Sequence, residues 1–193
     1  MAQPWIDAVR KSGQLTVYSE LSGSWANIYG LAIEAFNKFN LGVRLVKADA
    51  ETAANVLLRQ ASGTAVYTYG DQQFTRPFSG TALHGYTMQL ASDGKIEKAV
   101  CFLPATPQSQ DGFINGKMQT SAVGQDAMLV IAVHELIHAG GLENKDHAED
   151  GLFYFPLGLS GKKMIVPEKG KNNRPLPPLF LANSTVSKLK ALW

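Results

Sequence analysis

The stretch SAVGQDAMLVIAVHELIHAGG, residues 121–141, constrains the fold of this chain more than any other segment. Every residue over 127–133 is apolar. A helix that is apolar on all sides must be buried by other parts of the fold. Gly140 and Gly141 follow, and glycine readily adopts the positive φ that ends a helix in a sharp turn. The sequence therefore predicts a buried helix that stops at this glycine pair.

Two histidines and a glutamate lie near the end of this helix. His134 and His138 are four residues apart, so their side chains project from the same helical face. Glu135 is rotated by about 100° and flanks whatever the two imidazoles bind. This geometry suits two metal ligands beside a general base for a metal-bound water. The alternative interpretation is a buried helix whose polar end faces solvent.

The motif resembles that of the metzincin metallopeptidases, whose pattern is H-E-x-x-H-x-x-G-x-x-H. His134, Glu135, His138 and Gly141 match the pattern by position, and Asn144 stands where the third histidine is expected. The resemblance implies a catalytic Zn²⁺ ion held by three histidines, with Glu135 as the general base. It also implies hydrolysis of peptide bonds as the activity.

The third metal ligand is expected in the segment after the glycine pair, because a catalytic zinc usually takes three protein ligands and a water. His147 lies three residues beyond Asn144. We favour His147 because imidazole is the common third ligand in the family that this chain resembles. Asp146 and Asn144 stay open as alternatives. The predicted metal ligands are thus His134, His138 and His147.

The order of patterns along the chain predicts an α+β fold in a single domain. Apolar residues recur at helical spacing over residues 25–40, with Ser24 as N-cap, and a last helix follows Ser184 as N-cap. The resemblance implies a metzincin-like (zincin) fold, with a twisted five-stranded mixed sheet, an early helix, a zinc-binding helix and a C-terminal helix. It divides the domain into an upper subdomain, 1–141, and a small lower subdomain, 142–193. The strands are expected over residues 15–18, 43–47, 55–61, 83–90 and 98–103.

The resemblance also assigns roles to residues outside the motif. The strand over 83–90 would form the sheet edge above the cleft, where an extended peptide could pair by β-augmentation. We interpret His84, on that strand, as a structural or cleft-wall residue. A methionine-containing turn is expected below the metal, at Met164 or at the position of Leu176. Tyr154 is interpreted as a packing residue.

Composition limits the range of partners. A net charge of +2 over 193 residues gives no reason to expect a nucleic-acid or membrane partner. No apolar run approaches the length that spans a bilayer, and the N-terminus lacks a secretory signal pattern, so a soluble protein is expected. Cys101 is the only cysteine, which means that nitrogen and oxygen must supply most of the ligands of any metal.

These observations predict a zinc-dependent endopeptidase in which Glu135 accepts a proton from the metal-bound water. The substrate is expected to be a peptide or protein, including the peptide cross-links of peptidoglycan. A zinc-stabilised binding or virion-structural protein is the alternative from another class, and a fourth ligand such as Asp146 or His84 would favour it. Asn144 keeps open an inactive protease homologue. A glutamate ligand on a later helix is disfavoured, because Glu168 lies in a segment with no helical pattern.

Overall fold

The computed structural model describes residues 2–147, 158–160, 163–165 and 179–193. Its centre is a mixed five-stranded sheet with the strand order β2-β1-β3-β7-β6. Four of the strands are parallel to one another, and the edge strand β6 runs antiparallel to β7. The strands are β1 (Gln14–Ser19), β2 (Arg44–Lys47), β3 (Val56–Ala61), β6 (Tyr86–Ser92) and β7 (Lys95–Pro104). The expected α+β class and five-stranded mixed sheet are confirmed.

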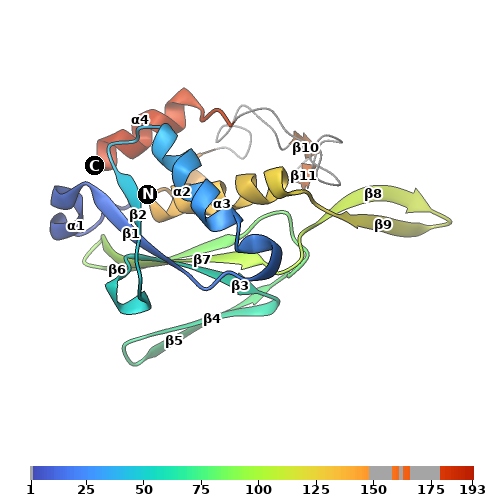
Figure 1. Ribbon diagram of the computed structural model, residues 1–193, viewed down its shortest axis with the longest axis horizontal. Coiled ribbons are helices and arrows are strands. Elements are labelled where there is room, and N and C mark those ends of the chain that lie inside the picture. Colours follow the sequence, from blue (N-terminus) through green and yellow to red (C-terminus); the bar gives the residue numbers. More distant parts are fainter. Residues whose placement is uncertain (1, 148–157, 161–162, 166–178) are drawn as a thin grey trace.

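Helices cover one face of this sheet (Figure 1). The helices α2 (Ile28–Lys38) and α3 (Gln125–Ala139) lie side by side there, and their apolar residues form the larger core with β1, β3 and β7. Two shorter helices, α1 (Asp7–Ser12) and α4 (Asn183–Leu192), lie at the periphery of the molecule (Figure 1). No helix in the described ranges is both long and apolar enough to cross a membrane.

A β-hairpin covers the opposite face (Figure 1). Its strands, β4 (Gly63–Tyr69) and β5 (Gln72–Phe78), pair antiparallel and bury Ala65 and Tyr67 in a second core. β7 therefore has a core on each side. Its residues alternate between them, with Cys101 on the helix side and Phe102 on the hairpin side. This double burial explains why the strand is continuously apolar from Ala99 to Pro104.

A second hairpin projects away from the body of the molecule (Figure 1). It consists of β8 (Gln108–Ile114) and β9 (Lys117–Ala122). Asn115 and Gly116 form its turn, and both have positive φ, 51° and 74°. An Asn-Gly pair favours such a turn because both residues tolerate the left-handed region.

Three of the expected boundaries are wrong. Ser24 is not the N-cap of the early helix, because it lies within a 3-10 turn, η1 (Gly23–Trp25), and α2 begins only at Ile28. The side chain of Trp25 is fully buried, and its Nε1 donates to the carbonyl of Pro104 at 2.8 Å, which holds the turn in the core. Ser184 lies inside α4, whose N-cap is Ala182.

The third correction concerns the edge strand, which begins at Tyr86 and not at residue 83. Gly85 explains the late start, because its backbone approaches two groups closely. A side-chain Cβ there would lie 2.5 Å from the carbonyl oxygen of Phe102 and 2.6 Å from Cγ of Glu135. His84 therefore lies in the loop before β6 and is exposed. The expected division into subdomains stays a prediction, since much of 142–193 lies outside the described residues.

Candidate metal centre

α3 carries the first two expected ligands and ends where the glycine pair predicts. The helix runs to Ala139, Gly140 is its C-cap, and Gly141 has a φ of 122°. A Cβ at Gly141 would lie only 2.5 Å from the carbonyl oxygen of Gln3, so both the conformation and the space require glycine. The turn at Gly141 lets the chain reverse toward the face of α3 that carries the histidines.

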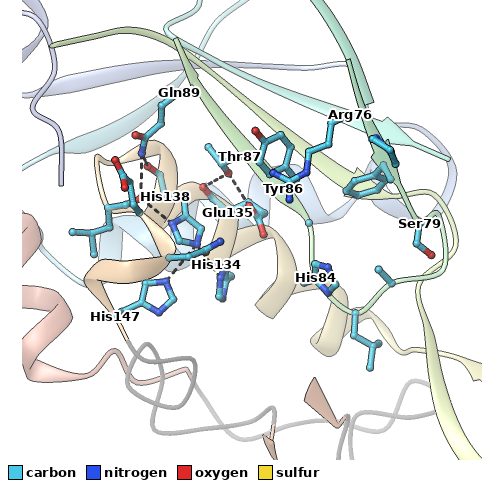
Figure 2. A pocket seen from close by; sticks show the side chains of 18 of the residues that line it. Arg76, Ser79, His84, Tyr86, Thr87, Gln89, His134, Glu135, His138 and His147 are labelled. Carbon is cyan, nitrogen blue, oxygen red and sulfur yellow. Dashed lines mark hydrogen bonds between the residues drawn. The ribbon is translucent and has the colours of Figure 1, made fainter. Parts of the chain in front are cut away.

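The three histidines meet at one point beside the end of this helix (Figure 2). The Nε2 atom of His138 lies 3.1 Å from Nε2 of His134 and 3.4 Å from Nε2 of His147. A tetrahedral zinc ion with Zn–N bonds of about 2.0–2.1 Å separates its nitrogen ligands by about 3.4 Å. The spacing of the imidazoles therefore fits a shared metal ion, and the fit does not itself identify the element.

His138 is held in the tautomer that can bind a metal through Nε2. Its Nδ1 lies 2.8 Å from the carbonyl oxygen of Leu142. A carbonyl can only accept a hydrogen bond, so Nδ1 carries the proton and the lone pair of Nε2 points toward the other two rings. A backbone carbonyl that fixes the tautomer in this way is a common partner of a metal-bound histidine.

Burial keeps the histidine pair on α3 in the neutral form that binds metals. Desolvation lowers the pKa of His138 to about 4. Desolvation also lowers the pKa of His134 well below its usual value, and the neighbouring histidines lower it further. Both imidazoles are thus unprotonated at neutral pH, as metal coordination requires.

Glu135 lies next to this cluster in a nearly closed environment. Its side chain is buried, and the hydroxyl of Thr87 on β6 donates to its Oε2 at 2.8 Å. Burial raises the pKa of Glu135 to about 7, while hydrogen bonds from Thr87 and the backbone of Gly85 lower it in part. A carboxyl group with this pKa can accept and release a proton near neutral pH, which suits a general base.

The turn after α3 is held by hydrogen bonds from distant parts of the chain. The last carbonyl groups of a helix lack partners within the helix and need other donors. The indole of Trp5 donates to the carbonyl of Ala139 at 2.8 Å, and the indole of Trp193 donates to that of Gly140 at 3.0 Å. The backbone N–H of Gln3 donates to Gly141 at 2.9 Å. These bonds fix the path that brings His147 back to α3.

Gln89 on the edge strand completes this set. Its amide nitrogen donates to the carbonyl of His138 at 2.7 Å and to that of Leu142 at 3.1 Å. Leu142 is the residue whose carbonyl also accepts from the His138 ring. Gln89 therefore helps to orient the ring of His138, a candidate metal ligand, by binding the Leu142 carbonyl that this ring also contacts.

Replacing Gln89 by methionine, which has a similar shape and no donor, is expected to weaken metal binding by about 10-fold or more. The two carbonyl groups would lose their donor, and the His138 ring would be less well fixed. A competition titration with a chromophoric chelator measures the change. The same replacement at Gln73, an exposed residue of β5, serves as the control. Equal affinities for parent and Gln89→Met would contradict this role.

The other expected ligands lie elsewhere. Asp146 accepts a hydrogen bond from the backbone N–H of Glu143 at 3.0 Å and caps the turn η3 (Asn144–Asp146). Asn144 is exposed, and His84 stands on the cleft wall, outside the metal group. Met164 lies in β11 (Lys163–Ile165), which pairs with β10 (Gly158–Ser160). Three further candidates, Tyr154, Glu168 and Leu176, lie outside the described residues.

The histidines line an open cleft of about 1090 Å³. The loop over residues 79–85 lines one side of it, together with the end of β5, the edge strand β6 and β8, and residues 142–145 also contribute. Arg76, Thr87 and Gln89 line the cleft although the sequence did not predict them as site residues. For the last two a signal was available, because polar residues at a two-residue interval on one strand must face a polar feature when the strand is part of a core.

The sequence matches no protein-family model, and no curated protein is significantly similar to it. The geometry and chemistry of the cleft are therefore the basis for inferring a function.

Proposed function

We propose that this protein is a zinc-dependent endopeptidase with a metzincin-like fold. The observation that supports it most strongly is the convergence of three Nε2 atoms from His134, His138 and His147 beside the buried carboxyl group of Glu135. These groups lie in an open cleft whose wall includes the edge strand of a sheet. A metal centre, a base and a binding strand are the three parts that metal-dependent hydrolysis of a peptide needs.

The ligand set favours zinc over other divalent ions. Three imidazole nitrogens suit zinc, whereas magnesium and calcium prefer oxygen ligands. Catalytic zinc sites have three protein ligands and keep the fourth position open. Within the described residues, the metal group contains no fourth donor. This supports a catalytic site over a closed site in a binding or virion-structural protein.

Several residues of the chain have separate roles in the proposed hydrolysis. When bound, zinc supplies a Lewis acid and lowers the pKa of a water molecule. Glu135 accepts the proton of that water and passes it to the leaving amine. Thr87 orients the Glu135 carboxylate through its hydroxyl. The edge of β6 that pairs with no strand in the described part of the chain offers backbone groups to an extended peptide, which places the peptide along the cleft.

The architecture also supports the metzincin-like assignment. The sheet has one antiparallel edge strand, the early α2 and the histidine-bearing α3 pack on the same face, and Gly141 makes the turn after the motif. The departure from the family pattern at Asn144 is compensated in our proposal by His147, three residues later. A peptide, a protein or the peptide part of peptidoglycan would all fit an open cleft of this kind.

Removal of the metal tests the proposal. The zinc-loaded protein is expected to cleave an unfolded protein such as casein, and dialysis against 1,10-phenanthroline is expected to abolish cleavage. Zinc added back should restore the activity, whereas magnesium and calcium should not. Metal content is followed by mass spectrometry and cleavage by gel electrophoresis. Full activity in a sample shown to contain no transition metal would refute the proposal.

A further inference from the structure

The cleft contains an arginine that is held in place by an aromatic stack. Arg76, near the end of β5, lines the cleft beside Tyr86 (Figure 2). Its guanidinium carbon lies 4.1 Å from the centre of the Tyr86 ring. The Tyr86 ring stacks on the buried Phe102, with 6.5 Å between centroids and an interplanar angle of 11°. Stacking orients a guanidinium group and leaves the N–H donors at its edge available.

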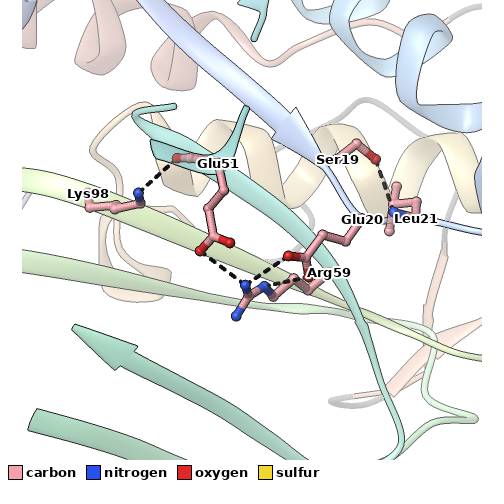
Figure 3. A network of polar contacts seen from close by, with 6 residues as sticks. All are labelled: Ser19, Glu20, Leu21, Glu51, Arg59 and Lys98. Atoms are coloured by element: carbon pink, nitrogen blue, oxygen red, sulfur yellow. Dashed lines mark hydrogen bonds and ion pairs between the residues drawn. The ribbon is translucent and has the colours of Figure 1, made fainter. Parts of the chain in front are cut away.

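A second arginine shows how this protein neutralises a stacked guanidinium when the role is structural. Arg59 on β3 lies 5.0 Å from the centre of the Tyr67 ring. Its Nη2 donates to Glu20 at 2.9 Å and to Glu51 at 3.1 Å, so two carboxylates share its charge (Figure 3). Arg76 makes the same kind of aromatic contact without such partners. Among the described residues, no carboxylate lies within ion-pair distance of it.

The other charged side chains that line the described part of the cleft are compensated. Lys145 pairs with Glu143 at 2.6 Å. Glu135 is buried and accepts a hydrogen bond from Thr87. Among the charged residues that line the described part of the cleft, Arg76 is therefore the one whose N–H groups are available to a bound molecule.

The edge strand relates this arginine to the path of a bound peptide. Among the described residues, β6 pairs only with β7, so a peptide that adds to its other edge would point alternate side chains to opposite faces of the sheet. Thr87 faces α3 and Glu135, whereas Tyr86 faces the hairpin and Arg76. A peptide side chain that points toward the hairpin would consequently meet the guanidinium group.

We propose that the cleft selects peptides that present a carboxylate to a subsite formed by Arg76 and Tyr86. The planar guanidinium fork matches a carboxylate with two parallel hydrogen bonds, and the aromatic stack has already restricted its rotamers. The carboxylate can come from an aspartate or glutamate side chain or from the end of a peptide. This inference rests on the endopeptidase proposed above and adds its substrate class.

Matched peptides test the subsite. The zinc-loaded protein is first given a mixed peptide library to locate its cleavage positions. Peptide pairs that differ only by glutamate or glutamine at each position near the cleaved bond then give ratios of kcat/KM, and pairs that end in an acid or an amide test the terminal carboxylate. We expect one position, or the terminus, to favour the carboxylate by about 10-fold, with a smaller ratio at high salt.

Variants test whether Arg76 causes the preference for a carboxylate. Arg76→Gln is expected to remove the ratio, and Arg76→Glu is expected to favour a lysine peptide instead. Arg44→Gln, on β2 at the far edge of the sheet, should keep the parent's preference. If Arg76→Glu prefers the lysine peptide, the variant is folded and active, so the change in specificity is due to recognition by residue 76 and not to loss of folding.

The outcomes distinguish this inference from the proposed function. If peptides are cleaved without any preference for a carboxylate, or if Arg76→Gln keeps the preference, the subsite is wrong and the endopeptidase proposal stands. If the zinc-loaded protein cleaves no peptide, the endopeptidase proposal fails. The same peptide pairs are then compared by fluorescence anisotropy. Tighter binding of the glutamate peptide that disappears in Arg76→Gln would support the subsite, and equal binding would overturn it.

Discussion

Replacing Glu135 by glutamine is expected to lower kcat for peptide hydrolysis by about 1000-fold while zinc remains bound. The amide has nearly the same shape as the carboxylate and can still accept a hydrogen bond from Thr87, but it cannot accept a proton from water. The histidine ligands and their hydrogen bonds are not altered by this change. Zinc content is measured by mass spectrometry, and kcat is measured with a peptide that the parent cleaves.

The matched control is Glu34→Gln, an exposed glutamate of α2 away from the cleft. It should leave both zinc content and kcat at the level of the parent. A Glu135→Gln variant that holds zinc and cleaves as fast as the parent would show that another group is the base. Loss of zinc in this variant would instead assign the carboxylate a role in metal binding.

Replacing His147 by alanine is expected to lower zinc affinity more than 100-fold. Zinc-finger peptides bind Zn²⁺ with about 10–16 kcal/mol at pH 7, so the loss of one of three protein ligands is expected to cost several kcal/mol. The rings of His134 and His138 would remain on α3, four residues apart, and two imidazoles alone hold zinc weakly. Competition against a chelator of known affinity gives the dissociation constant for zinc. The visible spectrum of the cobalt-substituted protein reports the loss of tetrahedral geometry.

Two further variants distinguish the alternatives for the third ligand. Asp146→Ala removes the cap of η3 but no nitrogen of the metal group, so it should weaken zinc binding far less than His147→Ala. His84→Ala, on the cleft wall, should leave affinity unchanged. If Asp146→Ala loses zinc and His147→Ala keeps it, the carboxylate is the third ligand and our assignment is wrong.

The core of the metal centre could be predicted from the sequence because its determinants are local. Helical spacing alone placed His134 and His138 on one face, and the positive φ at Gly141 followed from the glycine pair. His147 was predicted from ligand chemistry and a short loop, and the structure brings it to the other two. That these residues hold zinc and catalyse hydrolysis stays a prediction.

The surroundings of the centre could not be predicted, because they depend on contacts between distant segments. Thr87 and Gln89 face α3 only once β6 has taken the edge of the sheet, and Gly85 fixes where that strand begins. Arg76 reaches the cleft only because the β4–β5 hairpin folds over the sheet. The β8–β9 hairpin is different, since the pair Asn115-Gly116 is a local turn signal from which this hairpin could have been predicted.

The donors that secure the turn after α3 have a consequence for the order of folding. Trp5 and Trp193 both donate to carbonyl groups of this turn, and they are far apart in the sequence. Contacts between distant segments form slowly, because the entropy of closing a long loop must be overcome first. The path that brings His147 to α3 is therefore expected to form late in folding, after the helix itself.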